Sequence, residues 1–286
     1  MKGVPASLSA EWLKLRKRPA VWVLGLLLVT LASVLQYGVV VLLLATQPAN
    51  AALAPGLTAD ELRQSLHPVH WAQMTLAVFS TGSFGAPVAL ILGVLGYGSE
   101  YGWSTMKTIF TQRPGRLATV AGKVGALAAV VAIYTLAVFA GTAAMSAAIG
   151  AADGAPSPWP APAVIARAVL SGWLILCLWA GFGVALSVLF RQSALAIGLG
   201  LLYAIVLEGL VLNLGSQFSW VHEALPWFPG WNATSLVRSF GTAVRGTSTL
   251  TPTSTVGGVQ AALVVAAFTA AFVVISAVLL RRRDVA

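Results

Sequence analysis

The residues that could carry chemistry in this sequence are few, and they do not form a catalytic set. His67 and His70 flank Pro68, with Asp60 and Glu61 upstream, and imidazole and carboxylate groups are metal ligands. A three-residue spacing across a proline is poor for joint ligation, so no metal site is expected. The sequence also lacks a phosphate-binding Gly-x-x-x-x-Gly-Lys-[Ser/Thr] stretch, a His-Glu-x-x-His pair and a Gly-x-Ser-x-Gly elbow. We therefore expect no catalytic residue, no cofactor site and no ATP hydrolysis in this chain.

Glu208 is the other chemically notable residue, because it is an isolated acid inside a long apolar stretch. A carboxylate in hydrocarbon is costly unless it is paired, protonated or facing water. Three roles remain open for it: an intramembrane ion pair with Arg167 or Arg238 that ties helices together, a place on a substrate pathway, or titration during transport.

The elements that must position these residues are membrane helices. The chain has 286 residues, of which 58% are hydrophobic and 9% are charged, whereas a soluble domain carries about 25% charged residues. A helix needs about 20 apolar residues to cross the hydrocarbon, and the sequence offers runs without Asp, Glu, Lys or Arg over 19–59, 64–99, 124–152, 168–190, 192–207 and 246–280. We predict an all-α polytopic membrane protein, a single transmembrane domain over 1–286 with six transmembrane helices. They are expected at about 20–44, 73–97, 121–149, 164–189, from 193 through Glu208, and at 256–280, and Pro87 is expected to kink the second.

The basic residues indicate which way the chain is threaded. The net charge is +9, and all but four of the 17 Lys and Arg residues fall at the two termini or in alternate loops. The four exceptions are Arg63, Arg167, Arg238 and Arg245. Cytoplasmic loops carry the excess of Lys and Arg, so we expect both termini in the cytoplasm of a plasma (inner) membrane protein. The same distribution makes nucleic acid an unlikely partner.

The polar loop at 98–116, between the second and third spans, is predicted to contain a short amphipathic helix. Glu100 stands where the helix dipole favours an acid and Arg113 where it favours a base, and Pro114 ends the helix. One face would carry Trp103, Met106, Ile109 and Phe110. On these residues alone, the helix either anchors the loop at the membrane surface or docks on another protein.

This loop resembles the intracellular loop of ABC-transporter permease subunits of the type V exporter class. The matching positions are Glu100, Tyr101, Gly102, Thr105, Lys107, Pro114, Arg116 and Lys123. The resemblance implies that the loop forms a coupling helix on a separate ATPase subunit. The docking residues would be Glu100, Trp103, Met106, Lys107, Phe110 and Arg113.

Two further helical elements are expected outside the spans. Residues 7–18 predict an interfacial helix with Leu8, Trp12 and Leu15 on its apolar face, while Glu11, Lys14, Lys17 and Arg18 face away. Residues 217–245 are too polar to cross, and their aromatic and Pro/Gly content predicts a re-entrant outer hairpin of two short helices, with Asn232 or Thr234 as a cap. The resemblance implies that such a hairpin gates the outer exit, here with Trp220, Trp227, Phe228 and Trp231.

We therefore expect the permease subunit of an ATP-driven exporter. Its partners would be membrane lipid, an ATP-binding ABC ATPase subunit that carries ATP and Mg, and a second copy of itself or a related permease. The alternatives are a stand-alone secondary transporter or channel, an intramembrane enzyme, and a non-transporting scaffold or sensor. A stand-alone transporter would need several polar groups at mid-membrane, with broken helices around them.

Overall fold

The computed structural model describes residues 3–48, 51–54, 57–80, 82–102, 116–154, 158–215, 218, 223–241 and 256–282, and these form helices, two short strands and the turns between them. The first half contains α1 (Gly3–Arg16), α2 (Pro19–Thr30), the π-helical η1 (Leu31–Val39), α3 (Val40–Leu44), β1 (Ala52–Ala54), β2 (Leu57–Thr58), α4 (Ala59–Ser65), η2 (Pro68–His70), α5 (Trp71–Ala77), α6 (Gly85–Gly102) and α8 (Arg116–Ala152). The second half contains α9 (Pro162–Phe190), α10 (Ser193–Leu201), the π-helical η3 (Leu202–Leu207), α11 (Glu208–Gly215), η4 (Leu225–Trp227), α13 (Pro229–Arg238) and α14 (Gly258–Arg282). Strands β1 and β2 form one antiparallel pair, with Ala52 opposite Thr58 and Ala54 opposite Leu57.

Five helical stretches in the described part of the chain are long and apolar enough to cross a membrane. They cover Pro19–Leu44, Ala118–Ala152, Pro162–Phe190, Ser193–Val211 and Gly258–Arg281. Each overlaps one of the predicted spans. The chain turns between the fourth and fifth predicted spans, since Arg191 ends α9 in the left-handed conformation (φ 55°) and α10 begins at Ser193.

The second predicted span, 73–97, is not one continuous helix. It consists of α5 and α6, and the apolar helix within it is the shorter Gly85–Gly98. Gly82 lies between them with a φ of +83°, which a side chain would disfavour. A kink was expected at Pro87, but Pro87 lies in the first turn of α6, where no helical hydrogen bond is lost.

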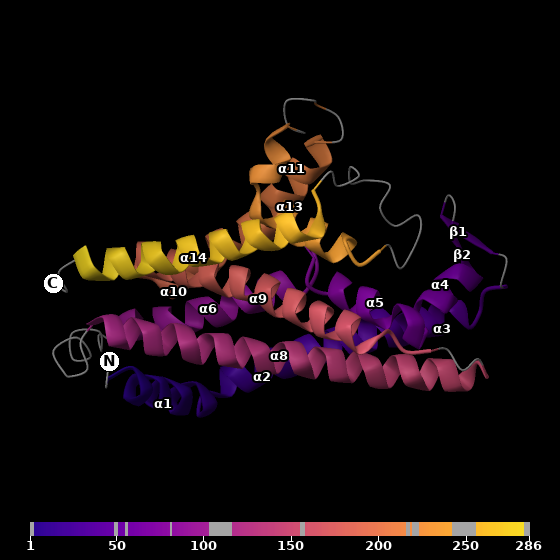
Figure 1. Ribbon diagram of the computed structural model, residues 1–286, viewed down its shortest axis with the longest axis horizontal. Coiled ribbons are helices and arrows are strands. Elements are labelled where there is room, and N and C mark those ends of the chain that lie inside the picture. The colour runs from indigo at the N-terminus through magenta and orange to yellow at the C-terminus, as the bar shows by residue number, and fades with distance from the viewer. Residues whose placement is uncertain are drawn as a thin grey trace.

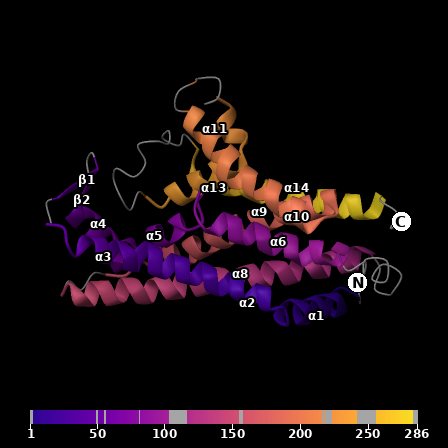
Figure 2. The same cartoon turned by 180° about the vertical axis from the view of Figure 1, so that it is seen from behind.

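Figure 1 shows α2, α6, α8, α9 and α14 lying side by side along the long axis, and Figure 2 shows the same arrangement from behind. Both ends of the chain lie at one end of this bundle, which we call the termini end. The β1–β2 pair and α4 lie at the other, which we call the distal end, while α11 stands away from the bundle.

Glycines set the closest helix contact in the bundle. A Cβ on Gly93 of α6 would overlap the carbonyl oxygen of Ala180 in α9, and a Cβ on Gly183 of α9 would overlap that of Leu90 in α6. Small residues allow membrane helices to approach to backbone contact. The helices α6 and α9 therefore pack as one unit through the middle of the bundle.

Candidate functional site

The predicted docking loop begins where α6 ends and finishes where α8 begins. Glu100 lies in the last turn of α6. The other five predicted docking residues lie outside the described residues, namely Trp103, Met106, Lys107, Phe110 and Arg113. What the structure describes is how the two flanking helices are held.

A buried ion pair joins α1 to the start of α8. The Lys123 ammonium lies 3.1 Å from Glu11 Oε2, and the Lys14 ammonium lies 2.8 Å from Glu11 Oε1. The Lys123 side chain is only 4% exposed, and its ammonium also lies 5.3 Å from the centre of the Tyr97 ring in α6. Because a buried ammonium needs a compensating anion, Glu11 holds α1 against α8.

The close approach of α1 and α8 depends on Gly122. A Cβ at Gly122 would overlap the Ser7 hydroxyl on α1. The corner between α1 and α2 is fastened to α6, since the Arg18 guanidinium donates a hydrogen bond of 2.8 Å to the Leu95 carbonyl oxygen. We call the contacts among Glu11, Arg18, Leu95, Tyr97 and Lys123 the termini-end frame.

The predicted orientation of the first helix is wrong in one respect. Glu11 was expected to face away from the apolar side, but Ser7, Glu11 and Leu15 are buried, whereas Leu8 is 40% exposed. The apolar periodicity of residues 7–18 carries no information about Lys123, which lies far along the chain. The ion pair between Lys123 and Glu11 fixes the orientation of α1, so that Glu11 faces α8.

Glu208 is the first residue of α11, its side chain contacts the beginning of α13, and it is almost completely buried, with 1% of its surface exposed. Its Oε1 accepts a hydrogen bond of 2.5 Å from the backbone N–H of Gly230, the second residue of α13. A Cβ on Gly230 would overlap the Glu208 carboxylate. The first N–H groups of a helix have no acceptor within the helix, so Glu208 caps α13 across a gap of 22 residues in sequence.

Neither predicted arginine partner forms an ion pair with Glu208 in the described part of the chain. The Arg167 guanidinium lies over the Phe240 ring at 5.5 Å. Arg238 is in the last turn of α13, at the opposite end of that helix from Gly230, and burial lowers its pKa. The partner of Glu208 is therefore the backbone N–H of Gly230 in α13, where a cation was expected.

The predicted gate aromatics differ in their surroundings. Trp231 is buried, Phe228 is half-buried and Trp227 is 79% exposed, while Trp220 lies outside the described residues. Asn232 was expected as a possible helix cap but lies inside α13. Its side-chain amide donates to the carbonyl oxygens of Pro226 (2.8 Å) and Phe228 (2.9 Å), which fastens the turn before the helix.

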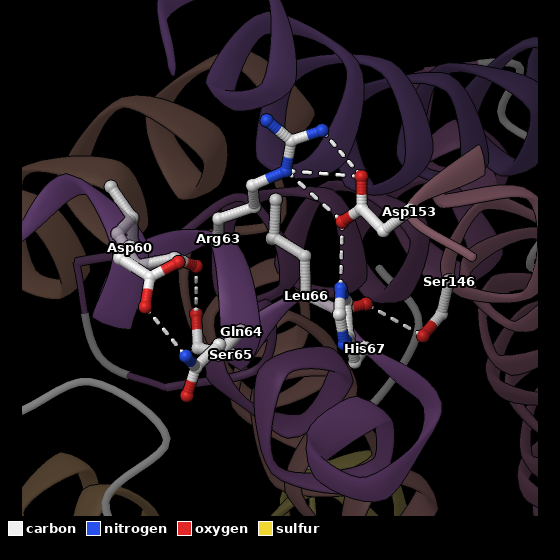
Figure 3. A network of polar contacts seen from close by, with 9 residues as sticks. Asp60, Arg63, Gln64, Ser65, Leu66, His67, Ser146 and Asp153 are labelled. Carbon is white, nitrogen blue, oxygen red and sulfur yellow. Dashed lines mark hydrogen bonds and ion pairs between the residues drawn. The ribbon is translucent and has the colours of Figure 1, made fainter. Parts of the chain in front are cut away.

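A polar network at the distal end ties α4 and the following turn to the end of α8 (Figure 3). The Arg63 guanidinium donates through Nε to both Asp153 oxygens, at 3.1 and 3.0 Å, and His67 Nε2 lies 2.8 Å from Asp153 Oδ2. The Ser146 hydroxyl donates to the Leu66 carbonyl oxygen at 2.7 Å. The hydrogen bond from Arg63, supported by His67, lowers the pKa of Asp153 to about 2. This network fixes a loop, and no group of three metal-ligating side chains converges among the residues that the structure describes.

One comparison with known proteins gives a match. The family model for the ABC-2 family transporter protein matches residues 7–207. No curated protein matches the chain. The matched range includes α1 from Ser7 onward, both helices that flank the predicted docking loop, and Glu11 and Lys123.

The Glu11–Lys123 pair yields a first prediction. Glu11→Gln removes the negative charge that pairs with the buried Lys123 ammonium, so the free energy of unfolding should fall by about 3 kcal/mol, because breaking one side of a buried ion pair is strongly destabilising. Denaturant unfolding in detergent measures this. Lys17→Gln removes a charge from an exposed site nearby and should change little. An equal loss in both variants would contradict the structural role of the pair.

The contact between Glu208 and Gly230 yields a second prediction. Gly230→Ala should destabilise the chain because its methyl group would overlap Glu208, whereas Gly209→Ala should be tolerated because nothing lies within 4 Å of its added Cβ. Glu208→Ala should cost about 1 kcal/mol through loss of the cap, and Glu208→Gln should cost less because its carbonyl oxygen can still accept. Thermal unfolding in detergent compares the four. Equal tolerance of the two glycine variants would disprove the close contact.

The distal network yields a third prediction, on pH. The pKa of Asp153 is about 2 instead of 3.8. The ionised carboxylate therefore stabilises the folded chain above about pH 4, and this contribution is lost as the pH falls toward 2. Asp153→Asn should lower the unfolding temperature at pH 7, and its gap from the wild type should narrow below pH 4. Asp60→Asn is the control, since among the described residues the Asp60 carboxylate bonds Gln64. A gap that widens on acidification would refute this assignment.

Proposed function

The chain belongs to the ABC-2 family of transporter proteins, and from that premise we propose that it is the membrane-spanning permease subunit of an ATP-driven exporter. Family membership together with five apolar helices of spanning length makes it a multi-pass membrane protein. The chain contains no phosphate-binding loop, so ATP and Mg would be held by a separate ABC ATPase subunit.

In this proposal the chain crosses the membrane six times. The two ends of the chain lie at the same end of the bundle, which supports an even number of crossings, one more than the five apolar helices of spanning length provide. The sixth crossing would be α6 with α5 extending it. The basic residues at both termini and in the loop between α6 and α8 favour a cytoplasmic location for the termini end.

The observation that carries the proposal is the termini-end frame around the ends of α6 and α8. A helix in residues 103–115 would be joined to α6 and α8, which are held to α1 through Glu11, Arg18 and Lys123. Movement of a bound ATPase could then displace these helices together. Because α6 contacts α9 backbone to backbone at Gly93 and Gly183, the movement would reach the middle of the bundle.

A second copy of the chain, or a related permease, would complete the pathway. The described helices carry large apolar side chains on outward faces, among them Leu26 at 70% and Leu42 at 71% exposed. Such apolar faces must be covered by lipid or by another subunit. The hairpin capped by Glu208 would then lie at the outer mouth and act as the gate.

The break between α5 and α6 is the feature that most favours the alternative, a stand-alone secondary transporter. Such transporters bind substrate and ions at broken helices near charged groups. Here the described polar side chains at the break, Ser80 and Ser83, bond to each other and to the carbonyl oxygen of Ala77. They are already satisfied, so the ATP-driven reading is the better supported.

A fourth prediction tests the docking loop. Phe110→Asp places a charge on the predicted apolar face and should abolish copurification of the ATPase, while the permease still inserts in the membrane. Thr108→Asp adds the same charge to the opposite face and should retain the ATPase. Undiminished copurification with Phe110→Asp would count against docking through this loop.

A further inference from the structure

A groove with a volume of about 240 Å³ lies between α9, α13 and α14. Its walls are largely apolar, formed by side chains that include Leu170, Leu174, Leu236 and Val259, and Arg167 is the charged residue among those that line it. Two of the apolar side chains are also strongly exposed on the outer surface of the bundle, Leu170 at 61% and Val259 at 78%. The groove is therefore open to whatever surrounds the helices.

Arg167 is a cation for which the described residues supply no carboxylate. Its guanidinium lies over the Phe240 ring, and no ion pair joins it to a described acid. The nearest acids in sequence are Asp153, which Arg63 and His67 hold, and Glu208, which caps α13.

The neighbouring segments cannot supply an anion either. The sequence contains no Asp or Glu between Asp153 and Glu208, and none from Ala224 to Arg283. This second interval includes all of α13 and α14 and the segment that joins them. Neither interval therefore places a carboxylate beside Arg167.

The depth of Arg167 matches a lipid headgroup. It lies five residues after Pro162, the first residue of α9, which corresponds to roughly 7.5 Å along the helix from its distal end. In a bilayer this places the guanidinium close to the phosphate level, with the apolar part of the groove facing the acyl chains. A free inorganic anion would gain nothing from the leucine and valine side chains.

We propose that this groove binds an anionic phospholipid, whose phosphate contacts Arg167 and whose acyl chain lies along Leu170, Leu174 and Val259. The charge of the site and its apolar walls are complementary to such an amphiphile. This inference does not depend on the transport function and would hold if the chain moved no substrate.

The experiment is a titration of the purified full-length chain in detergent with short-chain phosphatidylglycerol, followed by native mass spectrometry. Arg167→Gln and Val259→Trp should each weaken binding of the first lipid roughly tenfold, which corresponds to about 1.4 kcal/mol. Arg167→Lys should restore most of the affinity, which separates loss of the charge from misfolding.

Matched controls make the same kinds of substitution at positions outside the groove. Arg16→Gln removes an exposed cation at the termini end, and Leu263→Trp enlarges an exposed side chain one turn from Val259 on α14. Both should bind the lipid as the wild type does. If Arg16→Gln weakened lipid binding as much as Arg167→Gln does, the binding would be a general attraction between a basic protein and an anionic lipid. That result would overturn the proposal.

Two further results would overturn it as well. Competition by inorganic phosphate alone would identify a free-anion site. A loss of dimers in Val259→Trp, without any change in lipid binding, would identify the groove as a contact with a second copy of the chain.

Discussion

The arrangement at the termini end depends on one constraint, the burial of the Lys123 ammonium near the start of a long apolar helix. An ammonium in that environment requires an anion, and Glu11 on α1 supplies it. The pairing requires α1 to lie against α8, which in turn requires a glycine at position 122 where the two backbones approach. Arg18 then connects the corner after α1 to α6. The amphipathic helix α1 is thereby held near the two ends of the predicted docking loop, where α6 ends and α8 begins.

Two other described acids, Glu208 and Asp153, also fix the local structure around them. The sequence has 8 Asp and Glu residues against 17 Lys and Arg, so at least nine cations cannot be paired one-to-one with a carboxylate. Glu208 accepts from the first turn of α13, and Asp153 accepts from Arg63 and His67. These acids fasten a hairpin and a loop to the bundle. Arg167, to which the described residues bring no carboxylate, is the residue that we propose to bind an anionic lipid.

Patterns within a segment predicted much of this fold, because the membrane imposes them locally. Runs without charge predicted the positions of five spans. The break between α5 and α6 was missed because the stretch carries no charge, although Ser80, Thr81, Gly82 and Ser83 form a short polar run with a glycine, which is a turn signal. The contacts of Glu11, Glu208 and Asp153 were also missed. Each joins residues that are distant in sequence, and no local periodicity encodes such a pairing.

The central claim is that this permease works as one half of an ATP-driven machine, with its docking loop held by the termini-end frame. The most direct test is to purify the wild-type chain gently from its native membrane and to measure both subunit stoichiometry and ATP hydrolysis. The account predicts an ABC ATPase present in equal amount to the permease and ATP hydrolysis by the complex. A permease recovered from intact membranes with no nucleotide-hydrolysing partner would contradict it.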